Sequence, residues 1–451
     1  MKTREKLDAA TQNPCKLCAP LGASIVFRGI RGALPFLHGS QGCSTYIRRY
    51  LINHFREPVD IASSNFSEET TIFGGKQNLL DGLKNICRQY QPEIIGVAST
   101  CLSETIGDDV PMILREFFLK STSEILPKIV SVSTPSYSGT HMDGFHNAVL
   151  SVVSAIAARG NKLRQIGIFP GLVSSADIRY LKEVMGDFGL DHVILPDYSE
   201  TLDGGPWTEY QKIQQGGTSV GQIASLGHSS GIIEFGDSLK MKETAGTFLE
   251  KHFSVPRFAS GLPIGIKLTD LFFKLLEKMS GREIPSKYRL ARSRLVDSYV
   301  DGHKHLFEKK AVVYGDEDIV IAVASFLFEI GVVPVLCATG ARTGTIKRVL
   351  PEIASAYDKK ITVCEGIDFE QIYEKTENLD ADFMIGNSKG YYIARKRGIP
   401  LIRIGFPIHD RIGAQRILHL GYRGTQQLFD RIVNTVIEKR QEASSVGYSY
   451  I

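Results

Sequence analysis

The stretch PEIIGVAST, residues 92–100, is a short apolar run that ends directly before Cys101. It follows residues 78–90, whose apolar side chains recur at helical spacing. A helical pattern followed by a buried strand is typical of parallel sheets joined by helical crossovers. Ligands of such sheets bind beyond the carboxyl ends of the strands, so Cys101 stands where a ligand site is expected.

The same alternation of short apolar runs and helical stretches occurs in three blocks. The first block continues to an expected strand at 129–136, the second opens with RQIGIFPG (164–171), and the third opens with KAVVYGDED (310–318). Each block predicts a doubly wound α/β unit. The sequence therefore predicts an α/β protein with three doubly wound parallel-sheet domains.

The domain boundaries follow from these blocks. We expect an N-terminal α/β domain at 1–160, a second at 161–309 and a third, with a C-terminal helical tail, at 310–451. The segment 261–288 predicts an amphipathic helix with a glycine stop, which bridges the second and third domains.

Composition narrows the classes of function. Apolar residues make up 43% of the 451 residues, and 53 basic against 49 acidic residues leave a formal charge of +4. This balance gives no reason to expect a nucleic acid or a membrane as a partner. The N-terminal residues lack the apolar core of a signal peptide, and no run of about 18 apolar residues would span a bilayer. We therefore expect a cytoplasmic protein.

Seven cysteines in a chain without a secretory signal favour free thiols or metal ligands over disulfides. Cys15 and Cys18 form a Cys-x-x-Cys pair, but no second pair follows at the spacing of a structural zinc site. A thioredoxin-like disulfide is also disfavoured, because the pair precedes the first convincing strand. The sequence therefore favours neither a structural zinc site nor a redox disulfide at this pair.

Three cysteines fit a different chemistry. Cys18, Cys43 and Cys101 stand beside Gly, Pro or Thr in sequence typical of shaped loops. Thiolates from distant loops, or from two chains, hold iron–sulfur clusters. Three further cysteines are expected to be small buried hydrophobic residues: Cys87, Cys337 and Cys364.

The surroundings of Cys43 suit an anionic group. The glycines of HGSQGC, residues 38–43, leave backbone N–H groups free to approach sulfide or thiolate. Five basic residues lie nearby in the sequence: His38, Arg48, Arg49, His54 and Arg56. Each one alone is interpreted as an ordinary surface residue, but together they would form a cationic neighbourhood. No phosphate-binding P-loop is present, so this chain is not expected to hydrolyse ATP.

These motifs extend into a longer pattern. HGSQGC is followed by HFREP (54–58), FGG (73–75), STCLSE (99–104) and STPS (133–136). Later segments continue it: PSKYRLARSRLVDSYVD (285–301), MIGNSKG (384–390), IPLIRIGFPIHDRIG (399–413) and GYRGTQQLFD (421–430). Along essentially its whole length the chain resembles the β-type subunits of the nitrogenase component 1 family. The family includes catalytic β chains, NifN-type assembly scaffolds and nitrogenase-like reductases such as methylthio-alkane reductase.

The resemblance implies a fold and a set of ligands. The family fold is three doubly wound α/β domains, in agreement with the blocks above. The family's cluster cysteines match Cys18, Cys43 and Cys101, which would bind half of an iron–sulfur cluster shared with an α-type chain. That cluster would be [8Fe-7S]-like (a P-cluster) or [4Fe-4S]. Ser136 matches a serine that adds an oxygen ligand upon oxidation, and Cys15, extra to the pattern, is a spare thiol or an alternative ligand.

The resemblance also implies partners and a function. The expected assembly is an α2β2 heterotetramer served by a transient, ATP-binding iron–sulfur reductase homodimer, the Fe protein. The chain would relay electrons to a catalytic metallocofactor in the α-type partner, with carbon–sulfur bond reduction of methylthio-alkanes as a specialisation. Phe55, Arg56 and Glu57 are expected to shape the interface or the cluster surroundings. The alternative is a NifN-type scaffold for cofactor assembly, which the short N-terminus favours.

Overall fold

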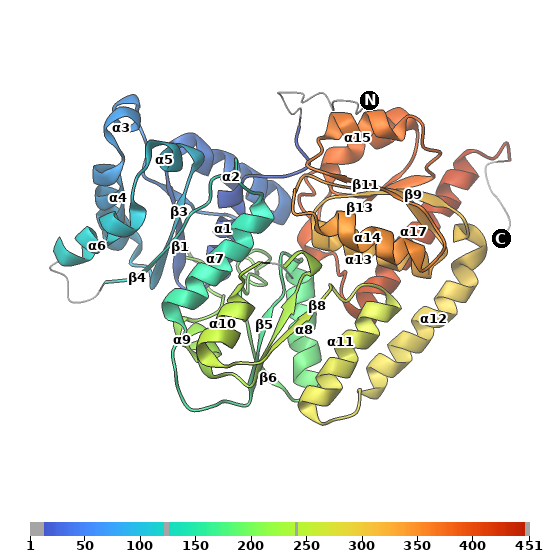
Figure 1. Ribbon diagram of the computed structural model, residues 1–451, viewed down its shortest axis with the longest axis horizontal. Helices are drawn as coiled ribbons and strands as arrows, with labels where there is room; N and C mark the ends of the chain where they lie inside the picture. Colours follow the sequence, from blue (N-terminus) through green and yellow to red (C-terminus); the bar gives the residue numbers. More distant parts are fainter. Residues whose placement is uncertain (1–12, 121–125, 240–241, 447–451) are drawn as a thin grey trace, which may run out of the picture. The chain divides into compact units, whose positions relative to one another are not determined.

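The strands of the computed structural model form three separate parallel sheets (Figure 1). The model describes residues 13–120, 126–239 and 242–446. The first sheet has the order β2-β1-β3-β4, the second β6-β5-β7-β8 and the third β11-β10-β9-β12-β13. The strands are β1 (Ala33–His38), β2 (Ala62–Ser63), β3 (Ile94–Ser99), β4 (Lys128–Val132), β5 (Gln165–Phe169), β6 (Asp191–Ile194), β7 (Gly231–Phe235), β8 (Arg257–Ser260), β9 (Lys310–Tyr314), β10 (Val333–Thr339), β11 (Thr362–Glu365), β12 (Phe383–Gly386) and β13 (Leu401–Arg403).

Helices connect successive strands in all three sheets, as parallel pairing requires. The α-helices are α1 (Ala19–Arg28), α2 (Gln41–Phe55), α3 (Glu68–Phe73), α4 (Lys76–Tyr90), α5 (Cys101–Ile106), α6 (Val110–Lys120), α7 (His141–Ile156), α8 (Ser175–Asp187), α9 (Val220–Ser225), α10 (Ala245–Phe253), α11 (Gly265–Ser280), α12 (Ser286–Leu306), α13 (Glu317–Glu329), α14 (Thr345–Ser355), α15 (Phe369–Thr376), α16 (Tyr391–Arg397) and α17 (Gly421–Glu442). Short 3₁₀ helices are η1 (Leu226–His228), η2 (Asp237–Leu239), η3 (Ser388–Gly390) and η4 (Ala414–Arg416).

The predicted fold class is confirmed, since all three sheets are parallel and helices join their strands. Two expected elements need correction. The strand expected at 129–136 ends at Val132, three residues before Pro135, which has no N–H for the ladder. The helix expected over 261–288 covers only Gly265–Ser280, because Gly281 adopts a left-handed conformation (φ 67°) and ends it.

The first sheet, which positions the candidate site, is covered by helices on both faces (Figure 1). On one face, apolar side chains of β1 and β3 pack against α4 and α6 in a single buried cluster. On the other face, α1 and α7 pack against the strands and against each other. Gly96 in β3 makes room there for the Phe27 ring, which a Cβ at position 96 would meet at 2.2 Å.

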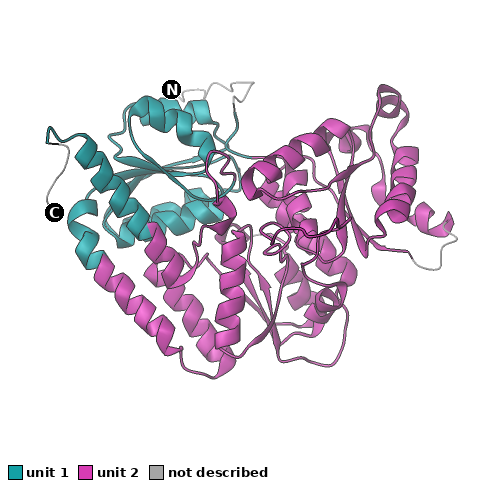
Figure 2. Ribbon diagram, turned by 180° about the vertical axis from the view of Figure 1, so that it is seen from behind, with its two compact units in different colours: residues 1–16, 299–406, 429–451 teal, residues 17–298, 407–428 magenta. Residues whose placement is uncertain are grey.

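The chain forms two compact units, coloured separately in Figure 2. One unit comprises residues 1–16, 299–406 and 429–451 and contains the third sheet. The other comprises residues 17–298 and 407–428 and contains the first and second sheets. The domain boundaries expected after residues 160 and 309 remain a prediction. Among the described residues, no helix combines the length and the apolar character needed to cross a membrane.

Candidate functional site

The carboxyl edge of the first sheet contains a point where the strand order reverses. β1 and β3 are neighbours, but β2 lies beyond β1 and β4 lies beyond β3. The two central strands end in register, because His38 pairs with Ser99. A reversal of this kind opens a crevice at the carboxyl ends of the strands, where α/β proteins bind ligands. The chain passes from β1 to Cys43 and from β3 to Cys101, so both thiols lie at this edge.

Each of the three predicted ligand thiols lies at the N-terminal end of a helix, whereas the sequence indicated loops. Cys18 is the N-cap of α1, Cys43 lies in the first turn of α2, and Cys101 is the first residue of α5. A helix N-terminus carries partial positive charge and favours a thiolate. Cys18 is exposed and the other two are half-buried, so all three retain access to a bound group.

Ser136 connects two of these thiols. Its backbone N–H donates a hydrogen bond to Cys101 Sγ (3.2 Å), and its Oγ accepts one from the N–H of Ala19 (3.1 Å), the residue after Cys18. The third thiol is close to both. Burial raises the pKa of Cys43, and electrostatic interaction with the groups of Cys18 and Cys101 raises it further, which requires these residues to be close. The structure thus brings Cys18, Cys43, Cys101 and Ser136 together.

Three thiols and a serine are donors of the kind that bind an iron–sulfur cluster. Within residues 13–120, 126–239 and 242–446, no three His, Cys, Asp or Glu side chains surround one position suited to a metal ion. Ligands of an iron–sulfur cluster bind different irons and so need not meet at one point. The N–H of Ser136 on Cys101 Sγ is the kind of hydrogen bond that tunes a cluster's potential.

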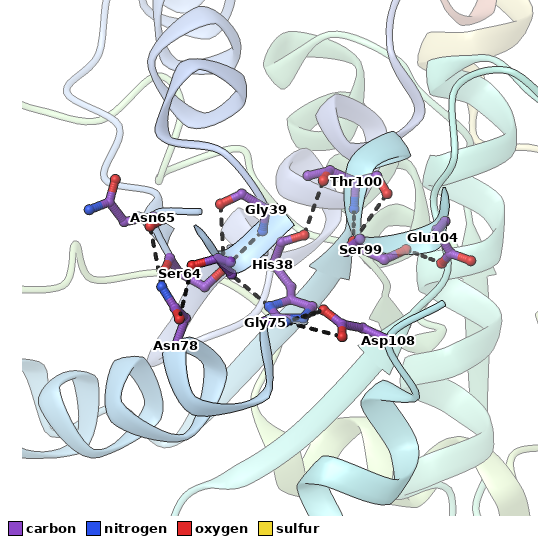
Figure 3. A network of polar contacts seen from close by, with 12 residues as sticks. His38, Gly39, Ser64, Asn65, Gly75, Asn78, Ser99, Thr100, Glu104 and Asp108 are labelled. Atoms are coloured by element: carbon purple, nitrogen blue, oxygen red, sulfur yellow. Dashed lines mark hydrogen bonds and ion pairs between the residues drawn. The ribbon is translucent and has the colours of Figure 1, made fainter. Parts of the chain in front are cut away.

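A buried polar network supports the end of β1 beneath this edge (Figure 3). His38 is fully buried, and burial lowers its pKa although Asp108 opposes the shift, so the imidazole is neutral. Its Nε2 donates to Asp108 (3.0 Å) and its Nδ1 accepts from Ser64 (3.1 Å). Asp108 also accepts from the N–H of Gly75, and Ser64 Oγ from the N–H of Gly39. These hydrogen bonds therefore fix the turn that connects β1 to Cys43.

A second set of hydrogen bonds holds the ends of β3 and β4 together. Ser133 Oγ donates to Glu104 (2.6 Å), and Ser99 Oγ donates to the same carboxylate. The N–H of Thr134 donates to Ser99 Oγ (2.9 Å). These contacts fix the segment that carries Ser136 against the segment that carries Cys101.

Gly39 is required where the loops after β1 and β3 cross. A Cβ at this position would lie 2.0 Å from Thr100 Oγ1 and 2.7 Å from its Cγ2. The Thr100 hydroxyl donates to the carbonyl of His38 (3.1 Å), so this contact is part of the network in Figure 3. The glycine therefore permits the close approach of the segments that carry Cys43 and Cys101.

The turn that carries Cys18 is held by the start of α7. The N–H of Leu17 donates to His141 Nδ1 (3.3 Å), and the N–H of His141 donates to the Leu17 carbonyl (3.0 Å). The helices approach so closely that a Cβ on Gly22 would lie 1.8 Å from the His141 carbonyl oxygen. Cys18 is thus anchored independently of any bound group.

Cys15 lies elsewhere, in the unit that contains the third sheet. It is 5% exposed, belongs to a core cluster with Leu336 and Phe369, and its N–H donates to the Ile367 carbonyl (3.3 Å). Burial raises its pKa to about 12, so the thiol stays protonated. Cys15 behaves as a core residue, and its geometry gives no support to a ligand role.

Of the three cysteines expected to be buried in the core, one is buried and two are half-buried. Cys337 is buried, whereas Cys87 and Cys364 are half-buried and pack against the core clusters of the first and third sheets. Phe55 is 1% exposed and packs against Tyr198, so it belongs to the core of this chain. Arg56 donates to the His409 carbonyl (3.1 Å), which ties the end of α2 to the segment 407–428.

Sequence reasoning missed the exposed side chains around the site. Tyr46, one turn after Cys43 on α2, and Tyr137, next to Ser136, are 50% and 66% exposed. Ile72 and Phe73 are 76% and 81% exposed at the end of α3, which packs against α5. Only their closeness in sequence to the recognised motifs signals these residues.

Comparisons with known proteins identify the family to which this sequence and fold are similar. The family model for nitrogenase component 1 type oxidoreductases matches residues 18–437. The nitrogenase molybdenum-iron protein beta chain of Methanothermobacter thermautotrophicus is 37% identical over 440 residues, covering 95% of both chains. The nitrogenase iron-molybdenum cofactor biosynthesis protein NifN of Bradyrhizobium diazoefficiens is 33% identical, covering 96% of this chain and 91% of its own. A chain of the solved structure of nitrogenase Cp1 at pH 6.5 superimposes with a TM-score of 0.95 at 32% identity, covering 100% of this chain and 99% of that one.

Proposed function

The chain belongs to the nitrogenase component 1 type oxidoreductase family, and we propose that it is the β-type subunit that holds an iron–sulfur cluster for electron relay. Cys18, Cys43 and Cys101 bind the cluster as thiolates, and an α-type partner supplies the remaining ligands. The cluster is P-cluster-like, [8Fe-7S], or a [4Fe-4S] cluster. When bound, it supplies one-electron transfer between the donor and the partner's metallocofactor.

The observation that supports this proposal most directly is the pair of hydrogen bonds that Ser136 makes beside two of the thiols. One residue touches Cys101 through its N–H and the turn of Cys18 through its hydroxyl, over 3.2 Å and 3.1 Å. Cys101 and the turn of Cys18 therefore have defined positions before any group binds, which lowers the cost of ordering them around iron. In this proposal the Ser136 hydroxyl supplies an additional oxygen ligand when the cluster is oxidised.

The partners in this proposal use the exposed surface around the thiols. An α-type subunit covers Cys18, Tyr46 and Tyr137 in an α2β2 heterotetramer, since exposed tyrosines are typical of interfaces. The ATP-dependent Fe protein docks transiently on Ile72 and Phe73, because α3 packs against the helix that begins with Cys101. ATP hydrolysis belongs to that protein.

Iron and sulfide analysis of the complex tests the cluster proposal. The chain, purified anaerobically with its α-type partner, should contain iron and acid-labile sulfide and show a paramagnetic signal that responds to reduction. Cys43→Ala should remove that signal, whereas Cys87→Ala, at a half-buried thiol outside the site, should keep it. A complex that lacks iron in the unaltered protein refutes the proposal.

A second candidate function is a NifN-type scaffold on which a precursor cofactor matures. Its support is the 33% identity to the NifN chain over nearly the full length. Length does not separate the two functions, because this chain also covers 95% of the Methanothermobacter beta chain. A reductase should turn over substrate with its ATP-dependent donor, and methylthio-alkanes are the substrates we would test first. A scaffold should instead transfer a precursor cluster to an apo-enzyme.

A further inference from the structure

A second potential site lies at the opposite end of the first sheet from the thiols. A cavity of about 850 Å³ opens where β3 and β4 begin, and its lining includes residues from the end of α4, from α6 and from the segment before β4. Its volume is in the range of pockets that bind small organic molecules. No residue that lines this cavity belongs to the proposed cluster site.

The cavity has an apolar floor. Phe117 is 4% exposed and belongs to the core cluster of the first sheet, and Cys87 and Leu126 pack against the same cluster. A bound molecule would therefore have an apolar surface to cover. A free inorganic anion gains nothing from such a floor.

The rim of the cavity is cationic. Lys84, Arg88 and Lys128 line it, whereas Glu93 is its one carboxylate. Glu93 pairs with Arg31 (3.6 Å) and Lys84 with Asp81 (3.5 Å), both at exposed positions. Among the described residues, Arg88 and Lys128 have no carboxylate partner within ion-pair distance. Two positive charges thus remain available beside an apolar floor.

We propose that this cavity binds a small organic acid with an apolar, preferably planar, body. The body lies against Phe117 and Leu126, and its acidic group lies between Arg88 and Lys128. A carboxylate or a phosphate can accept charge-assisted hydrogen bonds from these cations. The proposal does not depend on the function assigned to the thiol site, because the two sites share no residue.

Matched probes separate the two parts of the proposal. The probe is 1-anilinonaphthalene-8-sulfonate, tested on the full chain as purified with its partner, and N-phenyl-1-naphthylamine offers the same body without the charge. We expect the sulfonate to bind with a fluorescence increase and the neutral analogue to bind about tenfold more weakly, since charge pairing at an exposed rim is modest. Inorganic phosphate at the same concentration should not displace the probe.

Two further measurements locate the probe. The double variant Arg88→Glu/Lys128→Glu should weaken sulfonate binding by about tenfold or more. The control variant Arg115→Glu changes an exposed charge of α6 outside the cavity and should leave binding unchanged. Bound sulfonate should slow alkylation of Cys87, measured by peptide mass spectrometry, and leave that of the half-buried Cys364 unchanged.

Several results would overturn this inference. The first is the absence of sulfonate binding, and the second is equal sulfonate binding to the double variant and the unaltered chain. The third is a neutral analogue that binds as tightly as the sulfonate. The fourth is a rate of Cys87 alkylation that the bound sulfonate does not change. Loss of iron in the cluster experiments has no bearing on these outcomes, so the two proposals fail separately.

Discussion

The backbone N–H of Ser136 donates a hydrogen bond to Cys101 Sγ over 3.2 Å. The residues are 35 positions apart, and β3 and β4, which pair in parallel, bring them together. The contact places a donor on a sulfur that is proposed to bind iron, and a hydroxyl beside it.

Replacing Ser136 by Ala tests the role of that hydroxyl. The variant keeps the N–H on Cys101 and removes the acceptor for the N–H of Ala19, so we expect a loss of about 1 kcal/mol in unfolding free energy. The reduced cluster should keep its paramagnetic spectrum, whereas the oxidised cluster should lose an oxygen ligand and change. An oxidised spectrum identical to that of the unaltered complex would exclude Ser136 as a ligand.

Replacing Cys15 by Ala separates a core thiol from a ligand thiol. The side chain is buried in a cluster with Leu336 and Phe369, so the variant should unfold more readily, by roughly 1–2 kcal/mol. Its iron content should equal that of the unaltered complex. A fall in iron content without a fall in stability would mean that Cys15 is a ligand after all.

Replacing Gly39 by Ala should disrupt the site without touching any proposed ligand. The new Cβ would lie 2.0 Å from Thr100 Oγ1, so the loops after β1 and β3 must separate, at a cost of roughly 1–3 kcal/mol. Iron content and thermal stability should both fall, and Thr100→Ala in the same chain should partly restore them. The control is Gly221→Ala, where no heavy atom lies within 4 Å.

His54 should make stability fall in mild acid. Burial, then the nearby charge of His409, lowers its pKa to about 3, so the folded chain stays neutral at this position while the unfolded chain takes up a proton below about pH 6.5. Between these values the unfolded state binds more protons, and stability is lost as the pH falls, by up to about 1.4 kcal/mol per pH unit.

The variant His54→Asn measures this contribution. Its amide oxygen can accept from the N–H of Ile408, as His54 Nδ1 does over 2.9 Å. The urea midpoint of the variant should depend less on pH between 6.5 and 4 than that of the unaltered chain. His303→Asn, at an exposed position of α12, should leave the pH dependence as it was. Equal slopes for His54→Asn and the unaltered chain would refute the assignment.

The strands that the sequence predicted are short apolar runs that differ clearly from the helical patterns beside them. The runs at β3 and β9 were recognised because helical patterns flank them. β1 was missed, and it contains Pro35, which argues against a central strand although Pro35 here pairs with Gly96. β7 was missed as well. It contains Glu234, a buried carboxylate that pairs with Arg257, 23 residues later in the chain, and such compensation cannot be read locally.

The sequence named the residues of the candidate site, and their role as ligands remains a prediction, but the sequence did not indicate how these residues are arranged. The thiols at 18, 43 and 101 were identified by motif, but the glycine, proline or threonine near them suggested loops where the structure has the N-terminal ends of helices. The contact between Ser136 and Cys101 depends on the register of β3 and β4, which no local pattern fixes. The cationic cavity near Cys87 also had no sequence signal, because four separate segments form it.

Anomalous diffraction at the iron edge, from crystals of the complex with its α-type partner, tests the central claim most directly. We predict iron at bonding distance from the sulfur atoms of Cys18, Cys43 and Cys101. We predict none beside four other sulfur atoms: those of Cys15, Cys87, Cys337 and Cys364. Iron bound to other residues of this chain, or three ligand thiols with no iron beside them, would contradict the account.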